Sequence, residues 1–340
     1  MLQKAVIFFV FLFTVVIIGF LAYAFYAPED KIGDEITIEI PTGSSIRTVA
    51  RILEENNVIN NADIFHGTIR VLEKDYRVQA GRFVLRQNYG VFRAIEGLRG
   101  SPLVEDIAIM IPEGLTVWET ASIIARVFEN VDSAAFVALA YNEDFVQRTG
   151  LPAGIRSLEG YLFPETYRFP KLARAEDIIL RMVATHRRIF DELPRAARVA
   201  NFSNHEIVVM ASIVEKEARV ADERPLVAGV FYNRLERGIT IGADATVRFA
   251  VQNFDRPLRV SQLNSDSPYN TRRFRGLPPG AIASPGRASL AAAKNPDDTD
   301  YLFFMARWDG SGRHHFTRTY REHDRIKHEV RRRNPHLDNF

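Results

Sequence analysis

The sequence contains no cysteine, which excludes disulfides, thiol nucleophiles and cysteine-based zinc sites. It also lacks a glycine-rich phosphate loop, a nucleophile-elbow motif and a His-Glu-x-x-His pattern, so nothing indicates nucleotide, acyl-transfer or zinc-protease chemistry. The histidines are poorly spaced for a metal: His314 and His315 are adjacent, and His323 and His328 are five positions apart. We therefore expect surface or structural histidines, with no metal and no cofactor.

A strong excess of charge of one sign is also missing. The 340 residues carry a formal net charge of +2, and no basic patch is interleaved with aromatic residues, so nucleic acid is not an expected partner. The basic run from Arg331 to Arg333 is typical of a solvated helix end. With 46% hydrophobic and 25% charged residues, the chain can bury a sizeable core and is expected to form two or three modules.

Charged side chains and histidine are absent from residues 5–27, a run of 23 positions. As a helix this run would reach roughly 34 Å, enough to cross the hydrocarbon core of a bilayer. Because Lys4 precedes the run, we expect a single membrane span with residues 1–4 in the cytoplasm. The alternative is a cleaved signal peptide, for which Ala22 to Ala24 resembles a cleavage site. Residues 28–35 would be a linker, and everything after it would lie outside the cytoplasm.

A strand-turn-helix pattern occurs twice, beginning at Ile40 and at Ile111, 71 positions apart. In each copy a strand ends at proline, a glycine makes the turn, and Ser or Thr caps the helix that follows. The first copy belongs to a small α+β module over residues 36–100. Its other expected elements are a returning strand at 80–85 and a helix at 91–98. A module of this size beside a membrane is more often a binding or spacing element than a catalytic one.

Residues 104–200 are expected to form a mixed region that connects this module to the rest of the chain. Helical periodicity is present at 117–128 and at 175–192. Between them, the loop 158–167 is dense in aromatic residues. Such a loop is either core packing or a wall that faces a ligand, and the sequence leaves both readings open.

Residues 201–340 are predicted to be dominated by helices, which makes the whole chain an α+β protein. Ser203 and Glu206 form a capping-box pattern, so a helix should begin at Asn204. Later elements are expected to be helices at 225–237 and 288–294, and a strand at 301–305.

Two glutamates, Glu215 and Glu217, lie near the end of the helix that begins at Asn204. At roughly 100° per residue they lie on opposite flanks of the apolar stripe, so they cannot form a carboxylate pair. Glu215 has Arg219 four positions later, which is typical of a solvated surface glutamate. Glu217 has apolar neighbours one turn away on both sides and no basic residue at those spacings, so burial would raise its pKa and suit it to act as a general acid. The alternative is an ordinary boundary residue of the helix.

Five motifs, in this order along the chain, are familiar as a set. They are EGYLFPETY at 159–167, ASIVEKE at 211–217, VFYNRL at 230–235, PYNT at 268–271 and GLPPGAIASPG at 276–286. Together they resemble the endolytic murein transglycosylases, the YceG-like family, over nearly the whole chain after the apolar run. The resemblance implies a LysM-like module at 36–100 and a catalytic transglycosylase domain at 201–340.

The resemblance also implies an activity and a location. The implied protein is a single-pass enzyme of the cell inner membrane. It would cleave the MurNAc-β-1,4-GlcNAc bond within nascent peptidoglycan strands in the periplasm, and so end their elongation. New ends would be 1,6-anhydro-MurNAc, and a glycan-polymerising synthase, a penicillin-binding protein, is a reasonable partner. The family's catalytic residue corresponds to Glu217, and our candidates for substrate binding are Asn233, Asp244, Tyr269, Asn270 and Thr271.

The sequence departs from the family pattern at two places. The family's Leu-Gln-Ser/Thr-Asp-Pro-Thr stands here as IGADAT at 241–246, so the glutamine, the hydroxyl and the proline are lost at Gly242, Ala243 and Ala245. The aromatic residue expected after Tyr-Asn-Thr is Arg272. Two other functions stay open: a hydrolytic muramidase with Glu217 as acid and Asp244 as base or nucleophile, and a non-catalytic, membrane-tethered scaffold that binds peptidoglycan.

Overall fold

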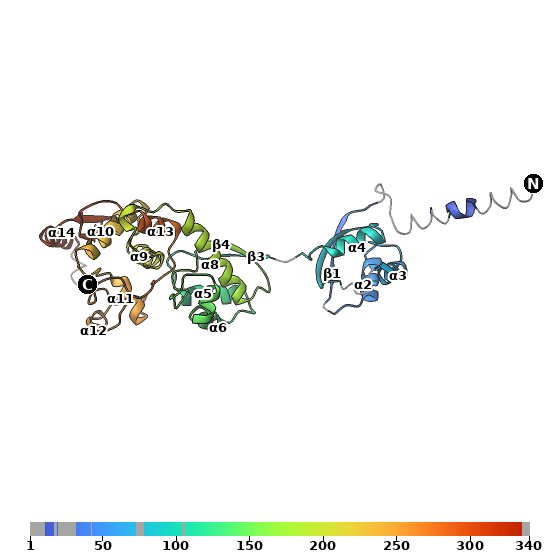
Figure 1. Ribbon diagram of the computed structural model, residues 1–340, viewed down its shortest axis with the longest axis horizontal. Coiled ribbons are helices and arrows are strands. Elements are labelled where there is room, and N and C mark those ends of the chain that lie inside the picture. The colour runs from blue at the N-terminus through green and yellow to red at the C-terminus, as the bar shows by residue number, and fades with distance from the viewer. Residues whose placement is uncertain are drawn as a thin grey trace, which may run out of the picture. The chain divides into compact units, whose positions relative to one another are not determined.

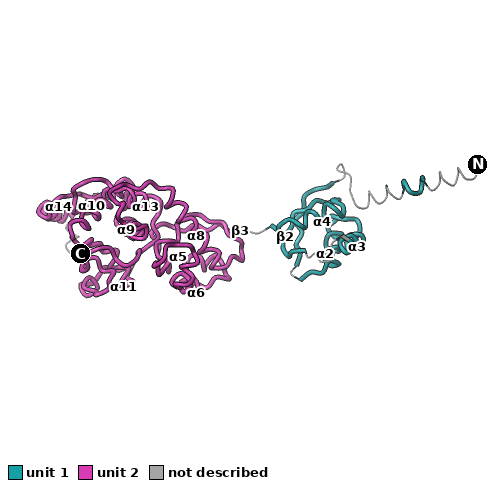
Figure 2. The backbone as a smooth tube through the Cα atoms, in the orientation of Figure 1, with its two compact units in different colours: residues 1–106 teal, residues 107–340 magenta. Residues whose placement is uncertain are grey.

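The computed structural model describes residues 11–16, 19, 32–41, 43–72, 78–103 and 106–334. They divide into two compact units, residues 1–106 and residues 107–340 (Figure 2). Of the predicted membrane span at 5–27, the structure describes residues 11–16 and 19, which are helical, and the rest lies outside the described residues. Among the residues that the structure describes, no helix has the length and apolar character needed to cross a bilayer. The span therefore stays a prediction.

The first unit is built around an antiparallel pair of strands, β1 (Glu35–Ile40) and β2 (Gly81–Arg86), which runs in register from Glu35 opposite Arg86 to Ile40 opposite Gly81. Three helices complete it: α2 (Ile46–Glu55), α3 (Ala62–Leu72) and α4 (Val91–Arg99). Alternate strand residues face the core, which buries Ile38, Ile40, Phe83 and Leu85 against the helices. The predicted strands and the helix at 91–98 are confirmed.

The strand-turn-helix repeat is present in both units. Gly43 and Gly114 make the two turns with φ of 78° and 75°, a left-handed conformation that favours glycine. Ser45 then caps α2 by accepting from the Thr48 N–H, and Thr116 caps α5 (Val117–Val127) in a full capping box. In the second copy the strand is β3 (Asp106–Met110), which pairs with β4 (Thr166–Pro170).

The second unit is rich in helices, with short two-stranded sheets (Figure 1). The predicted helices at 117–128, 175–192, 225–237 and 288–294 are confirmed within about two residues at each end. Its remaining elements are α6 (Ser133–Ala140), α7 (Glu143–Arg148), α8 (Ala175–Glu192), η2 (Ala197–Val199), α9 (Asn204–Glu217), η3 (Ala221–Glu223), α10 (Arg224–Glu236), α11 (Asp244–Val251), α12 (Val260–Leu263), α13 (Arg287–Lys294), β5 (Phe303–Ala306), β6 (His314–Thr317) and α14 (Tyr320–Arg333).

Helix α9 runs through the core of this unit. It begins at Asn204 behind the predicted capping box of Ser203 and Glu206. Its residues 207–214 are all buried, and it packs against α10, α11 and α13. One continuous core joins Ile109 near the start of the unit to Ala293 in α13, so residues on both sides of position 200 pack together. Burial of so much of α9 holds its C-terminal end in a defined place.

Gly160, in the aromatic loop, permits the loop to pack closely on this core. Its φ is +86°, and a β-carbon there would overlap the Cβ of Ala281 and lie 3.1 Å from Cγ1 of Val208. We expect Gly160→Ala to lower the free energy of unfolding by about 2–5 kcal/mol, because backbone strain and overpacking add. Gly154→Ala is the matched control, since its φ is +91° but no atom lies within 4 Å of the added carbon. Denaturant unfolding should give this control only about 1–2 kcal/mol of loss, and equal losses for the two variants would contradict the packing argument.

Candidate active site

Glu217 is the last residue of α9, and its side chain is partly accessible to solvent while the preceding turns of the helix are buried. The C-terminal end of a helix carries partial negative charge, which disfavours a carboxylate there. The pKa of Glu217 is raised to about 7, first by loss of hydration and then by the negative charge of Asp244. The backbone N–H of Ala245 and the charges of Arg234 and Arg248 oppose the rise. A carboxyl with this pKa is substantially protonated near neutral pH and can donate a proton.

Several of the groups that raise or lower the pKa of Glu217 belong to α11, and two of them lie at its start. The N-cap residue of this helix, Ala243, offers no side-chain acceptor, so the first N–H groups of the helix are free of a side-chain cap. One of them, on Ala245, acts on the Glu217 carboxyl and lowers its pKa. The N-terminus of α11 therefore stabilises a negative charge on Glu217 once the proton has left.

Thr271, a predicted binding residue, holds the start of α11 in place. It is buried, and its hydroxyl lies 2.8 Å from that of Thr246 and accepts from the Ala243 N–H at 3.2 Å. Its carbonyl accepts from the Gly242 N–H at 2.9 Å. All these contacts are internal, so in this structure Thr271 positions the helix that faces Glu217.

Asn270 and Asn233 are also engaged by the chain itself. Asn270 is buried and donates to the carbonyls of Leu263 and Ser265 at 2.9 and 2.8 Å. Asn233 is buried and donates to the carbonyls of Thr299 and Tyr301, both at 2.8 Å. The Asn233 oxygen accepts from Arg198 at 2.5 Å. The two amides thus order loops around the site and leave no donor for a sugar in this structure.

Asp244 and Tyr269 are the two predicted binding residues whose side chains reach solvent. Asp244 is about half exposed and pairs with Arg272 at 2.6 Å, so the residue that departs from the family pattern forms an ion pair with the acid beside Glu217. Tyr269 is partly buried and its ring centroid lies 5.0 Å from that of Phe249 in α11. Of the five candidates, these two remain available to touch a substrate.

Arg234 is a functional residue that sequence reasoning missed, although it lies next to Asn233 in the VFYNRL motif. Its guanidinium donates to the carbonyls of Leu302 at 2.6 Å and Ile241 at 2.5 Å. Burial lowers its pKa, and its charge lowers that of Glu217. Arg234 therefore fixes the loop before α11 and supplies positive charge near the Glu217 carboxyl.

The prediction that Glu215 is a solvated surface residue paired with Arg219 is wrong. Its side chain is only 7% exposed, pairs with Arg224 of α10 at 3.4 Å and accepts from the Gly286 N–H at 3.0 Å. Both partners come from elements that fold back over α9, so local helix spacing could not reveal them. Glu215 ties α9 to the loop before α13 and is a structural residue.

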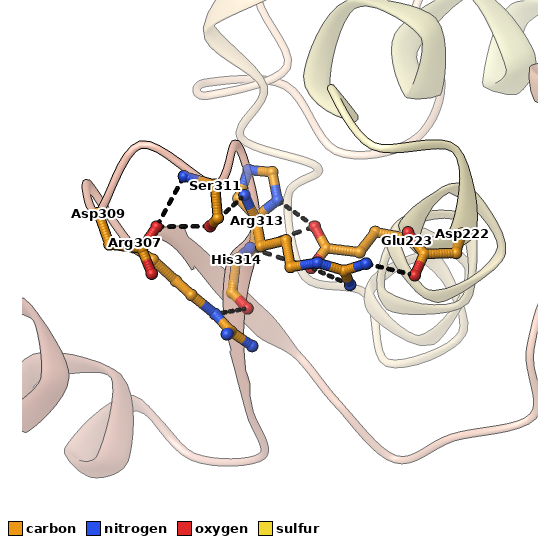
Figure 3. A network of polar contacts seen from close by, with 7 residues as sticks. All are labelled: Asp222, Glu223, Arg307, Asp309, Ser311, Arg313 and His314. Atoms are coloured by element: carbon orange, nitrogen blue, oxygen red, sulfur yellow. Dashed lines mark hydrogen bonds and ion pairs between the residues drawn. The ribbon is translucent and has the colours of Figure 1, made fainter.

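The segment that follows Glu217 is fixed by the network of polar contacts in Figure 3. Glu223 of η3 is buried and accepts from both the backbone N–H (3.1 Å) and Nδ1 (2.8 Å) of His314 at the start of β6. Beside it, Arg313 pairs with Asp222 at 2.7 Å. These contacts fasten the β5–β6 hairpin to the chain just after α9, and His314 has a structural role in them. Within the described part of the chain, no three histidine or acidic side chains gather as a metal ion would require.

The chain is similar to known proteins over most of its length. The model of the YceG-like family matches residues 38–329. An endolytic murein transglycosylase of Bacillus subtilis (strain 168) is 33% identical over 304 residues, which are 86% of this chain and 84% of that protein. One of Streptococcus pneumoniae serotype 2 is 27% identical over 85% of this chain and 57% of its own longer chain. A crystal structure of a YceG-like protein from Listeria monocytogenes is 33% identical, with a TM-score of 0.58 over 86% of this chain and 99% of that one. The chain therefore belongs to the YceG-like family.

Proposed function

We propose that this protein is an endolytic lytic transglycosylase that cleaves the MurNAc-β-1,4-GlcNAc bond within nascent peptidoglycan strands and leaves 1,6-anhydro-MurNAc ends. The observation that carries the proposal is Glu217, a partly accessible carboxyl with a pKa of about 7 at the meeting of two helix ends. The names of the Bacillus and Streptococcus relatives support the substrate class.

Glu217 alone can carry the reaction. Protonated, it donates its proton to the glycosidic oxygen as the bond to C1 of MurNAc breaks, so the GlcNAc side leaves as an alcohol. The carboxylate that remains takes the proton of the MurNAc C6 hydroxyl as that oxygen closes on C1. The proton count balances, Glu217 is protonated again, and no water is consumed. Because the nucleophile is already part of the sugar, positioning replaces a second acid.

The surroundings of Glu217 suit both halves of this cycle. Loss of hydration and Asp244 favour the protonated form that begins it. The Ala245 N–H, Arg234 and Arg248 favour the carboxylate that forms in the middle. Their opposition keeps the pKa near neutrality, where one group can serve as acid and then as base.

A hydrolase would need a second carboxylate to activate water or attack the sugar. Asp244 is the acid near Glu217, but its carboxylate is held by Arg272 at 2.6 Å. An ion-paired carboxylate is a weaker base than a free one. This supports the lytic reaction over the hydrolytic muramidase.

We further propose the location and partners that the family resemblance implies. Residues 5–27 would anchor the chain as a single span in the cell inner membrane with the N-terminus cytoplasmic, which places both units in the periplasm. The LysM-like module would hold glycan, and cleavage of a strand would end its elongation by a penicillin-binding synthase. Co-purification of such a synthase from cross-linked membranes, lost when residues 5–27 are replaced by a cleaved signal peptide, is the expected result.

Product analysis tests the reaction. The full-length protein in detergent is incubated with uncrosslinked glycan strands beside an Asp244→Asn variant, and the products are weighed by mass spectrometry. New ends lighter by one water than reducing ends, and formed by both proteins, are expected. Reducing ends of full mass that disappear with Asp244→Asn would establish a muramidase. Strand binding with no cleavage would favour the scaffold function.

A further inference from the structure

Four aromatic rings form a continuous row in the second unit. Trp118 of α5 stacks on Tyr141 with centroids 5.5 Å apart and lies 5.6 Å from Phe249, which in turn lies 5.0 Å from Tyr269. Phe249 is buried, whereas the other three pack against the core but stay partly exposed. Segments of the chain more than 100 residues apart thus bring three partly exposed rings into one row around the buried Phe249.

This row adjoins Glu217 through helix α11. The Ala245 N–H lies near enough to the Glu217 carboxyl to lower its pKa, and Phe249 follows four residues later on nearly the same face of that helix. One turn of an α-helix advances about 5.4 Å, so the row begins roughly one turn from the reacting carboxyl.

A buried carboxyl beneath the row fixes two of its rings. Glu159 accepts from the Tyr141 hydroxyl at 3.0 Å and from the Val117 N–H at 3.2 Å. Val117 is the first residue of α5, the helix that carries Trp118. Glu159 is 2% exposed, and burial raises its pKa to about 8. Burying a carboxyl costs free energy that an apolar core residue would not. Its contacts aim Tyr141 and orient the first turn of α5, which is a positioning role.

We propose that Trp118, Tyr141 and Tyr269 form a platform on which sugar rings of the glycan strand stack next to the bond to be cleaved, with Glu159 as the positioning residue beneath it. The inference rests on the proposed function. The faces of a pyranose ring present C–H groups with partial positive charge, which suit the electron-rich face of an aromatic ring. Uncharged contacts of this kind bind glycan with little dependence on salt.

The chain offers a direct probe, because its only two tryptophans are Trp118 and Trp308. In a full-length Glu217→Gln, Trp308→Phe protein, Trp118 is the sole tryptophan, and the first substitution slows cleavage enough for a binding titration. Titration with uncrosslinked glycan strands is expected to change Trp118 fluorescence with the same concentration dependence as binding measured by calorimetry. The matched control is the Glu217→Gln, Trp118→Phe protein, in which Trp308 is the sole tryptophan. Trp308 is exposed in the β5–β6 hairpin, and its fluorescence should not change during the same titration.

Kinetics in the active protein complete the test. Trp118→Ala should raise KM about tenfold with kcat little altered, the loss expected of one stacking contact. Trp118→Phe should restore most of the affinity. Glu159→Leu and Tyr141→Phe should raise KM by similar factors, because each removes one partner of the same hydrogen bond, while the melting temperature reports folding separately.

The outcomes separate the two proposals. Cleavage by the unmodified protein, together with binding that leaves Trp118 fluorescence unchanged, would overturn the platform and leave the proposed function standing. A fall in kcat alone for Trp118→Ala would also overturn it. Neither binding nor cleavage of glycan would overturn both.

Discussion

Replacing Glu217 with glutamine is expected to lower the rate of strand cleavage by about 10²–10⁴-fold, the usual contribution of a general acid. Glutamine keeps the shape of the side chain but can neither give a proton to the glycosidic oxygen nor take one from the C6 hydroxyl. The rate of appearance of 1,6-anhydro ends, measured by mass spectrometry under saturating glycan, is the readout. Binding should persist, because the amide still fits beside α11.

Glu215→Gln is the matched control, two positions away on the same helix. Its carboxylate pairs with Arg224 and accepts from the Gly286 N–H, so we expect a loss of about 1–3 kcal/mol of unfolding free energy. The folded fraction should cleave at nearly the normal rate. A reversed result, with the larger rate loss at Glu215, would contradict the assignment of the two glutamates.

Stability measurements should also distinguish the two variants. Because the pKa of Glu217 is raised by folding, its contribution to stability is complete below its unfolded pKa and is lost as pH rises through about 7. Glutamine does not titrate, so Glu217→Gln should be at least as stable as the unmodified protein at pH 8. The same substitution that removes activity thus should not remove the fold.

Local signals in the sequence predicted the helices well. The capping box at Ser203 and Glu206 placed the start of α9, and the apolar period from 175 to 192 gave the bounds of α8. In each case the information lies within a few residues of the feature it fixes. The strand-turn-helix repeat succeeded for the same reason, since its glycine and its cap are neighbours in the chain.

Partners from distant parts of the chain were beyond the reach of this reasoning. Gly286 lies 71 positions after Glu215 and decides that this glutamate is structural. Asn233 and Asn270 were candidates for binding because of their residue type, but carbonyls of loops that fold around them use their amides. The network of Glu223 and His314, 91 positions apart, gave no signal in the sequence at all.

The departures from the family pattern gain a physical meaning at Glu217. Alanine at 245, where the family pattern has proline, supplies an N–H that proline lacks, and that N–H lowers the pKa of Glu217. Arginine at 272, in place of an aromatic residue, pairs with Asp244. The N–H at 245 lowers the pKa of Glu217, so this chain should have a lower pKa at Glu217 than a relative with proline at 245.

The pH dependence of cleavage follows from the pKa of Glu217, about 7. The reaction begins with the protonated form, so kcat/KM should fall as pH rises above about 7, approaching tenfold per pH unit. Stopped assays of anhydro-end formation from pH 5 to pH 9.5 at low glycan concentration measure this falling limb of the pH profile. A flat profile across that range would mean that no group with this pKa donates the proton.

Two substitutions should move the limb in opposite directions and so assign it to Glu217. Asp244→Asn removes a negative charge that raises the pKa of Glu217, and it leaves Arg272 unpaired, so the limb should shift to lower pH. Ala245→Pro removes the N–H that lowers the pKa, and the limb should shift to higher pH; proline is tolerated in the first turn of a helix, where Ala245 lies. Asp266→Asn, which breaks the exposed pair with Arg273, should leave the profile in place. If Asp244→Asn and Ala245→Pro both kept the pH profile of the unmodified protein, the titrating group would not be Glu217, because both substitutions change the pKa of Glu217.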